Sequence, residues 1–437
     1  MHLFRNKLVT NSVIISTGAI LAGVFGYLFQ FVISRRLTVA AYGEFQSLNS
    51  LSLMTGAVSA TLGYFFLKFF PVFWKTKDYD SHRAFMGWTM EKIKKWIVVY
   101  AGCFLVLAPL IVLTFHLSGY YGLLFIILAA LVGVYSSIYS SALVGWEYFL
   151  WSGLAAIIAA AGKFVAGYVI VLFFPTATAV LFSFVIGALS GLAAYAFFYH
   201  RCFPPAGKDG NDGGAQYGDW KRKYYEKFDF KIELRHVFIF AVLITLLGNI
   251  DIFLVKSLTS AEMTGFYGSL HTLGTILLTL NAAVISAVSP SVYAAGHEGK
   301  KAGKKIVLFA YGAIAFVSGC GTLFFAAFPT FTVRMLFGAK YLSVAHDLWI
   351  FGALTFFLSV LMLEANFSYA RHIYRVSWAL LATAALAAAG VGLFHGSIRA
   401  IALAITVAFA CGYLLVFLLN WHTGKKRFLE AQPLVGI

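Results

Sequence analysis

The chain has 437 residues, of which 61% are hydrophobic and only 11% are charged. Soluble domains are typically about 45–50% apolar and about 25% charged, so this composition excludes a soluble enzyme domain and indicates a membrane protein with many spans. The formal net charge of +16 must then have a source other than a nucleic-acid-binding surface.

Twelve apolar segments are long enough to cross a bilayer, which takes about 20 residues. In chain order they are 12–34, 41–70, 96–116, 121–146, 151–174, 177–199, 236–257, 264–292, 305–328, 346–370, 375–395 and 399–420. A polar stretch divides them into two sets of six. We therefore predict an all-α polytopic membrane protein with an N-terminal lobe (1–199), an inter-lobe loop (200–235), a C-terminal lobe (236–420) and a tail (421–437).

The basic residues are distributed unevenly between the two sides of this topology. Counted on alternate sides, 25 of the 33 Lys and Arg residues fall on one side and six on the other. Because cytoplasmic loops are enriched in Lys and Arg, the bias predicts a multi-pass protein of the cell (inner) membrane with both termini in the cytoplasm. The net charge then reflects topology and contacts with anionic lipid headgroups, without a nucleic-acid partner.

The two halves contain a similar sequence near the start of each. Gly43-x-Phe45-x-Ser47-Leu48 is matched by Gly265-x-Tyr267-x-Ser269-Leu270 at an offset of 222 residues. Six spans separate the copies, so both enter the membrane from the same side. This pattern predicts two lobes related by a pseudo-two-fold axis along the membrane normal, as in transporters that alternate access between lobes.

Several segments resemble a known transporter superfamily. NIDIFLVKSLTSAEMTGFYGSLHTLGTILL (249–278), LFGAKYLSVAHDLWIFG (336–352) and RRLTVAAYGEFQSLNSL near the N-terminus are similar to polysaccharide repeat-unit flippases of the multidrug/oligosaccharidyl-lipid/polysaccharide exporter (MOP) superfamily. The resemblance implies a central cavity lined largely by spans 1, 2, 7 and 8. It also implies a substrate made of sugars on an undecaprenyl pyrophosphate carrier. The similar peptidoglycan-precursor flippases usually have fourteen spans, two more than predicted here.

Charged residues within the spans are candidates for function, since each costs about 2.5–3.5 kcal/mol at a helix centre. Lys163, midway through the fifth span, is either a cation that attracts an anionic headgroup or part of an ion pair or hydrogen bond that only holds helices together. Lys68 lies near the cytoplasmic end of span 2, where it either binds the pyrophosphate or sugar of the substrate or snorkels to the interface. Arg35, Arg36 and Lys256 are either interface anchors or a basic vestibule that grips the pyrophosphate.

Acidic and polar residues in the same spans predict further roles. Asp251 and Asn249, with Glu364 and Glu44, are candidates to carry a coupling H⁺ or Na⁺, and Asp251 can alternatively neutralise a nearby lysine. His271, Asn281, Gln30 and Gln46 can bind sugar hydroxyls, although helix–helix hydrogen bonds are the commoner fate of such residues.

Enzyme functions find no support in the sequence. It contains no H-E-x-x-H, G-x-S-x-G or P-loop motif, and its four cysteines are too widely spaced for a metal knuckle. We therefore expect no catalytic residues, no metal and no cofactor. The favoured function is an alternating-access flippase for a lipid-linked oligosaccharide, acting alone or with other polysaccharide-assembly proteins. The alternatives are a cation-coupled multidrug exporter of the same superfamily and a membrane-embedded glycan polymerase.

Overall fold

The computed structural model describes residues 2–203, 230–298, 300–370 and 373–427. Within these ranges, the side chains of 2–16, 64, 68, 230–234, 286–306, 370 and 422–427 are not described. The predicted loop and tail therefore lie largely outside the described residues. Every regular element in the described part is a helix, in agreement with the predicted all-α fold.

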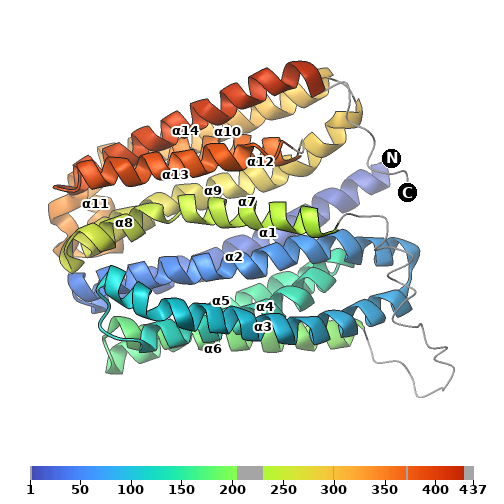
Figure 1. The fold of residues 1–437 in the computed structure, drawn as a ribbon, viewed down its shortest axis with the longest axis horizontal. Helices are drawn as coiled ribbons and strands as arrows, with labels where there is room; N and C mark the ends of the chain where they lie inside the picture. Colours follow the sequence, from blue (N-terminus) through green and yellow to red (C-terminus); the bar gives the residue numbers. More distant parts are fainter. Residues whose placement is uncertain (1, 204–229, 299, 371–372, 428–437) are drawn as a thin grey trace. The chain divides into compact units, whose positions relative to one another are not determined.

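The chain forms two compact units. The first contains 1–37 and 48–242, and the second contains 38–47 and 243–437. The start of the second transmembrane helix thus packs with the second unit, whereas the lobe boundary predicted from hydropathy kept that whole helix in the first. Figure 1 shows the helices of each unit running side by side.

Six helices build the first unit. They are α1 (His2–Arg36), α2 (Val39–Thr76), α3 (Tyr79–Phe115), α4 (Tyr121–Gly145), α5 (Phe149–Phe173) and α6 (Ala177–Cys202). Helix α5 packs on α1 and α6, and α6 packs on α4. Asp78 caps α3 by accepting a hydrogen bond from the Ser81 amide, and Thr176 caps α6 in the same way.

The rest of the described chain forms eight α-helices and one 3₁₀ segment, which belong to the second unit except that α7 lies in the first unit up to Val242. They are α7 (Phe230–Leu247), α8 (Ile250–Leu258), α9 (Ala261–Glu298), α10 (Lys300–Ala327), α11 (Pro329–Leu336), η2 (Ala339–Asp347), α12 (Leu348–Ala370), α13 (Val376–Leu393) and α14 (Ile398–Arg427). Helix α12 packs on α9, α10 and α14. The short α11 and η2, both on the predicted outer side, were not expected from hydropathy.

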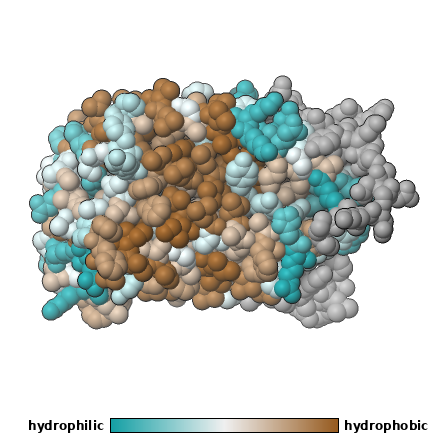
Figure 2. Space-filling view, turned by 90° about the horizontal axis from the view of Figure 1, so that it is seen from below, coloured by the Kyte–Doolittle hydropathy of each residue, from teal (hydrophilic) through white to brown (hydrophobic). Residues whose placement is uncertain are grey.

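The described helices account for eleven membrane spans, or twelve if α7 and α8 are counted as one broken span. The predicted number of about twelve is therefore confirmed. Figure 2 shows apolar residues covering the middle of the face in view, with hydrophilic residues gathered toward its ends. This arrangement is expected of a protein whose middle is surrounded by lipid.

Candidate functional site

The seventh span is broken in its middle. Helices α7 and α8 meet at Gly248 and Asn249 with a bend of 55°. At the break, the Asn249 side chain donates a hydrogen bond to the Thr245 carbonyl at 2.9 Å, so the predicted ion-coupling residue Asn249 caps the end of α7. Because the chain restarts as a helix directly afterwards, Asp251 lies in the first turn of α8.

Asp251, which is buried, and His271, which is partly buried, form a pair. The Nδ1 atom of His271 on α9 lies 2.7 Å from Oδ2 of Asp251. The Tyr267 hydroxyl donates to the same oxygen at 3.1 Å, and the Ile252 amide donates to Oδ1 at 2.9 Å. Tyr267 and His271 are four residues apart and so project from one face of α9, which directs both toward the carboxylate.

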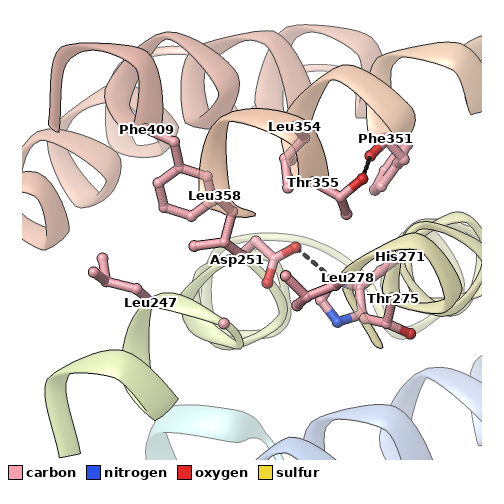
Figure 3. Close-up of a pocket in the computed structure, with 11 residues that line it drawn as sticks. Leu247, Asp251, His271, Thr275, Leu278, Phe351, Leu354, Thr355, Leu358 and Phe409 are labelled. Atoms are coloured by element: carbon pink, nitrogen blue, oxygen red, sulfur yellow. Dashed lines mark hydrogen bonds and ion pairs between the residues drawn. The ribbon is translucent and has the colours of Figure 1, made fainter. Parts of the chain in front are cut away.

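The pair lines a small cavity within the second unit. Figure 3 shows Asp251 and His271 facing each other, with Thr355 and Leu358 of α12 opposite. The remaining lining residues are mostly apolar: Leu247, Gly248, Thr275, Leu278, Phe351, Leu354 and Phe409. The cavity has room for about one water molecule, which suits a small ion or a proton and excludes a sugar.

The N-terminal ends of α2 and α9 cross in direct backbone contact. A Cβ atom added to Gly43 would lie 2.6 Å from the Gly265 nitrogen, and one added to Gly265 would lie 2.0 Å from the Val39 carbonyl oxygen. No larger residue fits at either position without moving a helix. Gly43 and Gly265 are the equivalent positions of the two sequence repeats, so the repeat residues meet each other.

Gln46 and Thr272 extend this contact one turn further along the two helices. The Gln46 Nε2 atom donates to the Gly268 carbonyl at 3.1 Å and lies in hydrogen-bond contact with the Thr272 hydroxyl. The Tyr42 hydroxyl accepts from Gln46 at 3.0 Å and lies 3.3 Å from Thr272. We refer to these residues, with Gly43 and Gly265, as the α2–α9 crossing. Gln46, predicted to bind sugar, is buried within this contact.

Lys256, near the end of α8, is also buried, with 4% of its surface exposed. Glu44 of α2 is the carboxylate that interacts with it electrostatically. An interface anchor is exposed to water, whereas Lys256 is buried and interacts with a carboxylate. Arg35 and Arg36, which end α1, are exposed, and Gln30 is half-buried on the same helix.

Lys163 of α5 is held by aromatic rings. Its ammonium lies 3.6 Å from the centre of the Phe184 ring and 4.7 Å from that of Phe29. Gly187 allows this approach, since a Cβ there would lie 2.6 Å from the Lys163 Cβ. A desolvated cation–π contact contributes about 2 kcal/mol, which offsets much of the cost of the buried charge. Among the described residues, no carboxylate forms an ion pair with Lys163.

Asn281 and Glu364 connect helices of the second unit. The Asn281 side chain donates to the hydroxyls of Ser318 and Ser359, at 2.7 and 2.9 Å. Glu364 accepts hydrogen bonds from the Tyr311 hydroxyl and the Asn420 amide. Both residues lie outside the lining of the Asp251 cavity. The side chain of Lys68 lies outside the described side chains.

Sequence reasoning missed the partners that define these sites. Tyr267, Thr272, Phe184 and Tyr311 were not selected, because an aromatic or hydroxyl residue in an apolar span is usually a packing residue. The signal available for Tyr267 was its four-residue spacing to His271.

Part of the chain matches a known protein family. The profile of a family described as "Polysaccharide biosynthesis protein" matches residues 224–346, which contain α7 to α11 and most of η2. Among curated protein sequences, none matches the chain.

Solved transporter structures share the fold over nearly the whole chain. An inward-facing MATE multidrug-resistance transporter of the MOP superfamily has a TM-score of 0.68 at 12% identity, covering 96% of this chain and 100% of its own. The lipid II flippase MurJ in an inward closed conformation has a TM-score of 0.65 at 13% identity, covering 95% and 89%.

A third structure is a MOP-superfamily transporter from Pyrococcus furiosus, described as having a binding pocket of reversed polarity. It has a TM-score of 0.64 at 14% identity and covers 97% of this chain and 95% of its own. These matches confirm the resemblance seen in the sequence. The chain is therefore a multi-pass membrane protein with the fold of MOP-superfamily transporters, and its segment 224–346 matches the polysaccharide biosynthesis proteins.

Proposed function

We propose that this protein is an alternating-access flippase that moves an undecaprenyl-pyrophosphate-linked oligosaccharide from the cytoplasmic to the outer leaflet. The observation that carries the proposal is Lys163, a membrane-embedded cation held by Phe29 and Phe184 without a carboxylate partner among the described residues. A cation held only by ring faces keeps its charge available to an anionic ligand. The polysaccharide-biosynthesis match over 224–346 supports the same substrate class.

Different residues have different roles in the proposed transport cycle. Lys163 attracts the pyrophosphate, and Arg35 and Arg36 bind phosphate oxygens at the outer end of α1, where guanidinium groups can form two parallel hydrogen bonds. The lipid tail stays in the bilayer. The α2–α9 crossing acts as an outer gate that opens to release the substrate. No covalent step is involved, so the protein acts as a transporter and not as an enzyme.

Energy coupling resides at Asp251. It is the acid that lines the second unit's cavity, whereas both oxygens of Glu364 accept hydrogen bonds from neighbouring helices. We assign a structural role to Glu364, and to Glu44 the role of neutralising Lys256. The coupling ion replaces a nucleotide as the energy source.

The test is reconstitution in liposomes with a fluorescent oligosaccharide on undecaprenyl pyrophosphate. Protection of the label from a membrane-impermeant quencher reports which leaflet it occupies. We expect movement to the other leaflet with the purified protein and none in protein-free liposomes. No movement under any imposed gradient would contradict the proposal.

A cation-coupled drug exporter is the second candidate, because MATE transporters match this fold as well as MurJ does. The buried carboxylate of Asp251 suits a coupling cation, whereas the cation of Lys163 opposes binding of a cationic drug. Drug accumulation in liposomes carrying the protein, compared with movement of the labelled lipid, separates the two functions.

Asp251→Asn keeps the shape of the side chain and removes its charge. We expect slower transport that no longer responds to an imposed ion gradient, with normal membrane insertion. The flipping assay run with and without the gradient measures this response. A variant that keeps the full gradient response would assign Asp251 a structural role.

The orientation of the chain is tested by labelling cysteines in intact cells. If both termini are cytoplasmic, a cysteine at Ser118 should react with an impermeant thiol reagent, and one at Gly210, which lies outside the described residues, should be protected. The native cysteines are replaced beforehand. Reversed labelling would invert the topology.

A further inference from the structure

We propose that the coupling ion is a proton shared between Asp251 and His271; this inference rests on the proposed function. Three groups lie within hydrogen-bond distance of the carboxylate: His271 Nδ1 at 2.7 Å, the Tyr267 hydroxyl at 3.1 Å and the Ile252 amide at 2.9 Å. An ionised carboxylate has about four sites for accepting hydrogen bonds. Three of them are therefore occupied, and only one remains for a metal ion.

The break between α7 and α8 is another place where a sodium ion could be coordinated. In transporters, unwound backbone carbonyls at such breaks coordinate sodium ions. Here the carbonyl of Ile244 accepts from the Gly248 amide at 3.1 Å and that of Leu246 from the Asn249 amide at 3.0 Å. The carbonyl of Thr245 accepts from the Asn249 side chain at 2.9 Å. These three carbonyl groups already have hydrogen-bond donors.

The chemistry of the nearest partner also favours a proton. Hard cations prefer oxygen ligands, whereas the atom closest to the carboxylate is an imidazole nitrogen. Histidine is the side chain that ordinarily gains and loses a proton near neutral pH. A histidine in direct contact with a carboxylate is therefore suited to proton exchange and poorly suited to sodium.

The pair can take up one proton without breaking its own contact. In one state the neutral ring donates Nδ1–H to the ionised Asp251, and the pair carries one negative charge. A proton taken from water in the cavity makes the pair neutral, either as a carboxylic acid with a neutral ring or as a carboxylate with an imidazolium. The same proton returns to water when the pair discharges. A hydrogen bond joins Asp251 and His271 in every state.

Most residues around the pair do not gain or lose protons, so the change of charge takes place on Asp251 and His271. The cavity residues contributed by α12 and α14, namely Phe351, Leu354, Thr355, Leu358 and Phe409, do not titrate. Helix α13, which packs on α8, has no titratable residue. Tyr267 on α9 contacts the carboxylate, and Lys256 on α8 interacts electrostatically with Glu44 of α2.

The location links proton uptake to the outer gate. His271 immediately precedes Thr272, which contacts Gln46 and Tyr42 in the α2–α9 crossing. A change of charge at His271 therefore acts on the turn of α9 that makes the gate contacts.

The test uses the full-length protein in lipid nanodiscs without substrate. Infrared difference spectra between acidic and alkaline buffer report protonation of carboxyl and imidazole groups, and melting curves at constant pH with increasing sodium chloride or choline chloride report sodium binding. We expect a pH-dependent signal that both Asp251→Asn and His271→Gln remove and that Glu364→Gln, the control at the second buried acid, retains. Sodium should shift the melting temperature no more than choline does.

Two results would overturn the inference. One is a rise in melting temperature with sodium, beyond that with choline, that Asp251→Asn abolishes, which would make Asp251 part of a sodium site. The other is a pH-difference spectrum that Asp251→Asn and His271→Gln leave unchanged in folded protein. Since no sugar lipid is present, neither result depends on whether the protein flips one.

Discussion

Replacing Lys163 by methionine should reduce the flipping of a lipid-linked oligosaccharide at least tenfold. Methionine keeps most of the stem and removes the charge, so the contribution of the ammonium to attracting the pyrophosphate is lost. A tenfold loss corresponds to only about 1.4 kcal/mol. The measurement is the initial flipping rate in liposomes, normalised to the amount of inserted protein.

The structure predicts that this variant stays folded. Among the described residues, Lys163 contacts the rings of Phe184 and Phe29 and no carboxylate, so its removal strands no buried anion. Cation–π contacts of about 2 kcal/mol roughly balance an insertion cost of about 2.5–3.5 kcal/mol. We therefore expect little change in the melting temperature in detergent.

Two matched variants separate charge from packing. Lys163→Arg keeps the charge with a different geometry and should retain part of the activity. Phe184→Leu removes the closer ring and leaves the lysine. It should therefore lower the melting temperature while most of the flipping rate is retained. If Lys163→Met is strongly destabilised and flips normally once stabilised, the cation has a structural role only.

Hydropathy predicted the number of spans well, because it is a property of single segments. A span needs a long apolar run, which can be read from the sequence without knowing what packs against it. The same reasoning could not place Thr38–Ser47 with the second unit. This grouping depends on backbone contact between Gly43 and Gly265, and each glycine alone gives no sign of its partner.

The candidate sites were predicted as single residues and not as arrangements. The cost of burying a charge singled out Lys163 and Asp251 without naming what stabilises them. Phe184 and His271 supply that stabilisation from other helices, 21 and 20 residues away along the chain. The break before Asp251 had a local signal in the dipeptide Gly248-Asn249, since both residues are weak helix formers. Hydropathy did not reveal the break, because the apolar residues continue on both sides of this dipeptide.

A disulfide across the α2–α9 crossing should stop transport. A Cβ atom built on Gly268 lies 3.2 Å from that of Gln46, slightly shorter than the 3.5–4.5 Å typical of disulfides. In a chain without Cys103, Cys202, Cys320 and Cys411, the pair Gln46→Cys and Gly268→Cys should therefore cross-link on oxidation. Flipping by the oxidised protein should fall to the background of protein-free liposomes and return on reduction.

The physical reason is that, in the proposed mechanism, the crossing separates whenever the outer side opens. Gly43 and Gly265 leave no space between the helices in the described arrangement, and hydrogen bonds from Gln46 close the next turn. A covalent bond at that turn holds α2 and α9 together through every attempted cycle. The two single-cysteine variants are the controls, because neither can form the bond and so oxidant should not change their rates. A fully cross-linked protein that flips as fast as its reduced form would show that transport does not require this crossing to open.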